Sequence, residues 1–105
     1  MSTPLTPEEM VAVLAQKFEA MKTRHDFQPG QLVRWKAGLK NRELPENDQP
    51  AIVWAVLAKP VFDAAPGAGT PYFHEPLDIV LAVMDKEKDF LLYHYDSRRF
   101  EPFPK

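Results

Sequence analysis

The hydrophobic positions near the start of the chain follow the spacing of an α-helix. Four apolar residues recur at separations of three and four, which places them on one helical face: Val11, Leu14, Phe18 and Met21. Thr6 and Glu9 have the spacing of a capping box, and Pro7 suits the first helical position. The pattern therefore predicts a helix over residues 7–25.

After Pro29-Gly30 the pattern changes to that of short strands between polar, proline-rich segments. Four strands are predicted: Leu32–Lys36, Ala51–Leu57, Leu77–Met84 and Phe90–Tyr95. The second is apolar on both faces, which is typical of a central strand that is covered on both sides. We expect the helical stripe to cover its second face. The same stripe fits a short heptad seam, so a helix–helix dimer is the alternative, and we expect a monomer or a weak homodimer.

The end of the chain predicts a hairpin followed by a turn. Residues 85–89 form a five-residue hairpin loop, across which Met84 faces Phe90. A 3₁₀ turn is expected at Ser97–Phe100 and a brief closing strand at Glu101–Phe103, so that the phenylalanines of this segment close the end of the core.

This order of elements resembles an SH3-like barrel that carries an N-terminal helix. The residues that carry the resemblance are Pro29–Val33, Pro50–Leu57 and Leu77–Tyr95. It implies a mainly β, α+β domain over residues 1–105, a small barrel of about five antiparallel strands with the helix packed on it. The aromatic motif with which SH3 domains take proline-rich peptides is absent, so that specificity is not implied. The layout PGxLVxWKxGLKN, EPLDI, DSRRF also resembles small bacterial proteins, a likeness that implies no activity.

Composition narrows the class of protein. A chain of 105 residues is one domain by length, and its formal charge of −2 lacks the basic excess of a dedicated nucleic-acid binder. There is no cysteine, which excludes disulfides and cysteine zinc sites and fits a cytoplasmic protein. The longest apolar run, Ala51–Ala58, is too short to span a bilayer, and the first residues lack a signal peptide's pattern, so no membrane association is expected.

A basic stretch with one tryptophan is the first candidate site. Four cations without an acid surround the aromatic residue: Arg34, Trp35, Lys36, Lys40 and Arg42. Such a cluster can hold phosphates while an exposed Trp stacks on a base, which makes a nucleic-acid-binding barrel one hypothesis. In the alternative, Trp35 lies in the core beside Val33 and the cations are solvated on the outer face.

A second candidate site combines imidazole and carboxylate groups, which can bind a divalent metal or transfer protons. Its residues are His74, Glu75, Asp78, His94 and Asp96. Pro76 and the strand that follows rule out the helical geometry of a zinc-protease motif. A structural role is the alternative: Asp96 caps the turn, and Arg98 or Arg99 pairs with Glu75, Asp78 or Asp85.

No nucleotide-binding glycine loop or nucleophile elbow is present, so we expect no cofactor, no metal and no catalytic residues. The preferred hypothesis is a non-enzymatic module that binds a protein partner through the long loops 37–50 and 59–71. The residues expected to contact a partner come from the basic stretch and from these loops: Arg34, Trp35, Lys36, Leu39, Lys40, Arg42, Tyr72 and Phe73. Leu44 belongs to the same surface if it is exposed.

Overall fold

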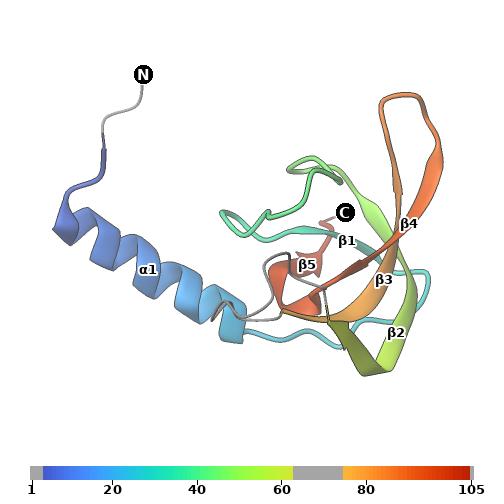
Figure 1. Cartoon of the computed structure of the whole chain (residues 1–105), viewed down its shortest axis with the longest axis horizontal. Coiled ribbons are helices and arrows are strands. Elements are labelled where there is room, and N and C mark those ends of the chain that lie inside the picture. Colours follow the sequence, from blue (N-terminus) through green and yellow to red (C-terminus); the bar gives the residue numbers. More distant parts are fainter. Residues whose placement is uncertain (1–3, 63–74, 105) are drawn as a thin grey trace, which may run out of the picture.

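The computed structural model describes residues 4–62 and 75–104. The chain forms a small α+β domain with one helix and five strands (Figure 1). The elements are, in order, α1 (Pro7–Lys22), β1 (Leu32–Trp35), β2 (Ala51–Phe62), β3 (Pro76–Met84), β4 (Phe90–Tyr95), the 3₁₀ turn η1 (Ser97–Arg99) and β5 (Phe100–Pro102). The expected residues Tyr72, Phe73 and His74 lie outside the described part.

Helix α1 begins as its capping signals predict and ends earlier than expected. The Thr6 backbone N–H donates to the Glu9 carboxylate at 2.9 Å, and the Glu9 N–H donates to the Thr6 hydroxyl at 3.2 Å, which completes the capping box. The helix ends at Lys22, because Thr23 is already extended and the chain then turns so that Phe27 enters the core. The predicted end at residue 25 is therefore wrong.

The five strands form one antiparallel sheet in the order β4-β3-β2-β1-β5. Met84 pairs with Phe90 across the five-residue loop, as predicted. Strand β2 runs to Phe62, five residues past its expected end, with irregularities in its pairing with β3. Among the described residues no pairing joins β4 to β5, so the sheet is open.

One face of the sheet carries the hydrophobic core. Alternating residues of the strands point to this inner face, and the side chains buried there include Val33, Trp35, Val53, Ile79, Leu81, Val83, Tyr95 and Phe100. The Trp35 ring stacks on Phe100 at 4.3 Å between ring centroids, and the Tyr95 ring meets Trp35 edge-on at 5.8 Å. The predicted face of β3 is thus confirmed, and so is the core position of Trp35.

Helix α1 contributes no buried residue to this core. Its last turns approach η1 and the loop after β1, while the rest runs away from the sheet (Figure 1). Val11 and Leu14 are each 67% exposed and Phe18 is 58% exposed, so the expectation that this stripe covers the second face of β2 is wrong. The Cα radius of gyration, 15.2 Å, exceeds the roughly 13 Å of a compact domain of this length, and the projecting helix contributes to this extension.

Candidate interaction surface

The basic stretch does not form one exposed cationic surface. Trp35 is buried, and its indole N–H donates to the Pro45 carbonyl at 2.6 Å. The Arg34 guanidinium lies 2.8 Å from the Glu101 carboxylate and 3.5 Å from that of Asp48. The Trp35 ring is therefore not available to stack on a base, and the charge of Arg34 is offset by neighbouring acids.

Lys36 is buried beneath the C-terminal end of α1. Its ammonium group donates to the backbone carbonyls of Ala20 and Thr23, the second at 2.5 Å. These oxygens lie where the last helical carbonyls lack partners and where the helix dipole favours a cation. Burial lowers the pKa of Lys36 below its ordinary value, although Glu101 and Asp96 partly offset the effect. Lys36 thus fixes the end of α1 to the end of β1.

Replacing Lys36 with Met is expected to loosen the last turn of α1. The variant keeps the side-chain length and removes both charge-assisted hydrogen bonds, each of the kind that contributes about 1.5–3 kcal/mol. Part of the lost stabilisation is offset, because the variant no longer buries a charged group. Amide protons in the last turn of α1 should therefore exchange about tenfold faster than in the wild type, while the exchange of β3 amide protons does not change. Hydrogen exchange followed by NMR measures this. Lys59→Met removes an equal charge from an exposed site and serves as the control.

The loop 37–50 is held against the sheet. Leu39 is buried, and Lys40, Arg42 and Leu44 are half-buried. The Tyr95 hydroxyl donates to the Leu44 carbonyl at 2.7 Å, and burial raises the pKa of Tyr95 well above its ordinary value. Between this loop and β4 lies a hollow of about 310 Å³, lined by Arg42, Glu43, Leu44, Leu77, Tyr93, His94 and Tyr95. Of the residues expected to contact a partner, Trp35, Lys36 and Leu39 are therefore buried, and only Leu39 of these lies in this loop.

The acids of the second candidate site are engaged by the turn that follows β4. The Asp96 carboxylate accepts from the Arg98 backbone N–H at 3.0 Å and from its guanidinium at 2.6 Å, and Arg99 bonds Glu75. The Ser97 hydroxyl and backbone N–H donate to Asp78 at 2.9 and 2.8 Å. The expected cap by Asp96 and the pairing of an arginine with Glu75 are confirmed.

Burial of Asp96 opposes its ionisation, but the hydrogen bonds from Arg98 lower its pKa below the ordinary value. A carboxylate that is saturated by a guanidinium and backbone donors has little capacity left for a metal. His94, the remaining described member of the imidazole–carboxylate set, is exposed and pairs with Val80. Asp78 lies on the same face two residues along β3, but its carboxylate already accepts from Ser97. This arrangement ties the turn to β3 and is structural in character.

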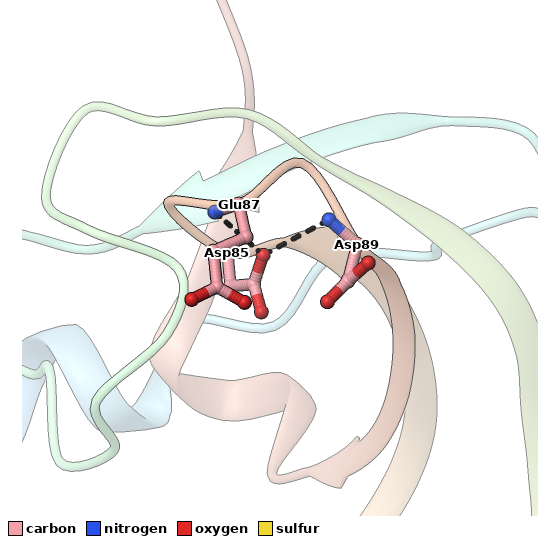
Figure 2. Close-up of side chains that lie close together, drawn as sticks. All are labelled: Asp85, Glu87 and Asp89. Atoms are coloured by element: carbon pink, nitrogen blue, oxygen red, sulfur yellow. Dashed lines mark hydrogen bonds between the residues drawn. The ribbon is translucent and has the colours of Figure 1, made fainter.

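Figure 2 shows three acidic side chains gathered in the β3–β4 loop. The oxygens of Asp85, Glu87 and Asp89 lie within 4.8 Å of one another, the one such group in the described part of the chain. The Asp85 carboxylate already accepts the backbone N–H groups of Glu87 and Asp89, each at 2.9 Å. The acids lie close together because Asp85 caps the backbone of the hairpin loop, which is a structural role.

The most prominent exposed feature is on the outer face of the sheet. The register aligns Leu32, Ile52, Ala82 and Leu92 in one row across β1, β2, β3 and β4. Met84 and Phe90 form the next pair, and the Trp54 ring meets Phe90 edge-on at 6.4 Å.

We call this surface the outer patch and define it by eight residues: Leu32, Ile52, Trp54, Val80, Ala82, Met84, Phe90 and Leu92. Trp54 is 56% and Phe90 61% exposed, whereas Ala82, within the row, is buried and Ile52 and Val80 are half-buried. With about 100 Å² for each half-exposed large side chain, the patch presents about 500 Å² of apolar area. That is at the upper end of what monomeric proteins expose, and such patches mark contact surfaces.

The sequence contained the signal for this patch, but only its β2 part was recognised. Toward the β3–β4 loop the residues between the core positions are again apolar, where a solvated antiparallel sheet would carry polar side chains. At the other end of the same two strands this face carries the polar residues Asp78 and His94. The apolar stripe of α1 predicted a cover for this face, and the structure places that stripe elsewhere.

Comparison with protein-family models, curated proteins and solved structures found no match to this chain. No helix in the described ranges is both long and apolar enough to cross a membrane.

Proposed function

We propose that this chain is a non-enzymatic protein-binding module and that its contact surface is the outer patch. The observation that carries the proposal is the uninterrupted apolar row that crosses four strands and is flanked by Trp54 and Phe90. Aromatic residues and Met are enriched in protein interfaces and charged residues are depleted from their centres, and the patch has this composition.

The proposal moves the contact surface away from the loop 37–50. Three of the residues expected to contact a partner are buried: Trp35 and Lys36 of the basic stretch and Leu39 of the loop. A nucleic-acid-binding function gains no support, because the ring that would stack on a base, Trp35, and one of the cations, Lys36, are buried.

The proposed architecture is an SH3-like barrel. Support comes from the return of β5 to pair with β1 and from the 3₁₀ turn directly before β5. In the OB-fold, another small five-stranded barrel, a strand face and two loops bind ligands, which agrees with a binding role for this architecture.

Site-specific photo-crosslinking tests the proposed contact surface. A benzophenone amino acid replaces either Phe90 in the outer patch or Asn47 in the exposed part of the loop 37–50, in cells that naturally express the protein. Irradiation should yield a discrete protein adduct from position 90 and not from position 47. The adduct should disappear when Met84→Glu places a charge in the same patch. An adduct only from position 47 would return the contact to the loop, and no protein adduct from either position would refute the binding module.

A further inference from the structure

Two of the apolar surfaces in the described part of the chain lack a cover from other described residues. One is the outer patch. The other is the exposed stripe of α1, formed by Met10, Val11, Leu14 and Phe18. An amphipathic helix normally derives most of its stability from packing its apolar face, and a stripe open to water lacks that contribution.

The chain cannot bring its own stripe onto its own patch while the contacts of α1 hold. Lys36 fixes the end of the helix beside β1, through the carbonyls of Ala20 and Thr23. Gly38, with a φ of +75°, passes so close to Lys17 that a Cβ there would meet its Cε at 3.3 Å. From this anchor α1 runs away from the sheet, on the side opposite the β3–β4 hairpin (Figure 1).

We propose that the occupant of the outer patch is α1 of a second copy of this chain. The inference rests on the proposed function and names the partner. Each copy carries one stripe and one patch, so a two-fold dimer in which the helices are exchanged covers all four of these surfaces. A helix packed on a sheet face is a standard layer arrangement.

The dimensions of the two surfaces agree. The nine residues from Met10 to Phe18 span about 14 Å of the helix, and the five residues from Val80 to Met84 span about 17 Å of β3. With about 100 Å² for each half-exposed large side chain, the two helix–sheet contacts bury about 1,800 Å² in total. This lies within the 1,200–2,000 Å² of stable protein interfaces.

The alternatives cover less. A helix–helix dimer would join two stripes of about two heptads, which is short for a coiled coil, and would leave both patches in water. A contact between two outer patches would leave both helices uncovered. The exchanged arrangement also explains why β2 is apolar on both faces although its own helix does not cover it.

Light scattering on the purified full chain tests the dimer. The wild-type protein should elute at twice the chain mass of 12.0 kDa. Phe18→Glu on the stripe and Phe90→Lys on the patch should each elute at the single-chain mass. Both sites are exposed, so circular dichroism should show unchanged folding. Gln16→Glu, on the polar side of α1, is the matched control and should remain dimeric.

Mixing the two monomeric variants gives the decisive result. In an exchanged dimer, the carboxylate introduced at position 18 of one variant would face the ammonium group introduced at position 90 of the other. The second helix–sheet contact would be wild type on both sides. The mixture should therefore regain the mass of a dimer, which neither variant forms alone. A dimer that Phe18→Glu abolishes and Phe90→Lys leaves intact would be a helix–helix dimer and would overturn the inference.

A wild-type protein that stays monomeric up to high micromolar concentration would also overturn the inference. The proposed function would survive that result if the adduct from position 90 had a mass other than twice that of the chain. Both the proposed function and the dimer inference would be refuted if position 90 gave no protein adduct.

Discussion

Replacing Trp35 with Ala is expected to lower the free energy of unfolding by about 3–5 kcal/mol, the range for removal of a large aromatic side chain from a core. The Trp35 ring is 3% exposed and stacks on Phe100, and its N–H is the donor to the Pro45 carbonyl. The loss is comparable to the lower end of total stability for a domain, about 5–15 kcal/mol, so a large fraction of the variant should be unfolded. Urea denaturation followed by circular dichroism measures it.

The second tryptophan provides the matched control. Trp54 is the same residue type on the same sheet, but it lies in the exposed outer patch. At concentrations where the chain is monomeric, Trp54→Ala should change the free energy of unfolding by about 0.5 kcal/mol or less. Equal losses for the two variants would mean that Trp35 is not in the core. Trp35→Phe, which keeps an aromatic ring and removes only the donor, should fall between them.

Local signals in the sequence were sufficient for the start of the helix and for the order of the strands. The capping box at Thr6 involves atoms three residues apart, and the pairing of Met84 with Phe90 follows from the length of one short loop. Asp96 likewise bonds a backbone N–H two residues away. Each of these features depends on neighbours in sequence, so pattern and spacing determine it.

The position of the helix and the use of the cations could not be predicted in this way. The spacing of the stripe predicts that one face of α1 is apolar, but it does not predict which surface packs against that face. The sequence around Lys36 is also the same in both cases: it does not distinguish a solvated ammonium group from one that donates to the carbonyls of Ala20 and Thr23. Both properties depend on contacts between residues distant in sequence, which a single sequence does not reveal.

Replacing Asp96 with Ala is expected to cost about 3 kcal/mol of unfolding free energy. Its carboxylate is 1% exposed and is the partner of the Arg98 guanidinium, so truncation leaves that cation without its counter-charge and removes the cap of η1. The value is at the low end for broken buried pairs because Arg98 retains contact with water. Asp48→Asn, which removes the charge of an 86% exposed partner of Arg34 and keeps a side chain that tolerates the φ of 64° at this position, should cost less than about 1 kcal/mol. Urea denaturation at neutral pH compares the two variants.

The pH dependence of stability separates the charge of Asp96 from its shape. In the folded protein the pKa of Asp96 lies below its ordinary value, so the folded state binds this proton less tightly than the unfolded chain. The contribution of the carboxylate is therefore complete above about pH 4 and is lost as the pH falls through the lowered folded value. Asp96→Asn, which keeps a cap oxygen without charge, should be less stable than wild type at pH 7, and the difference should shrink in acid. A difference that is constant with pH would show that the hydrogen-bond geometry, and not the charge, carries the effect.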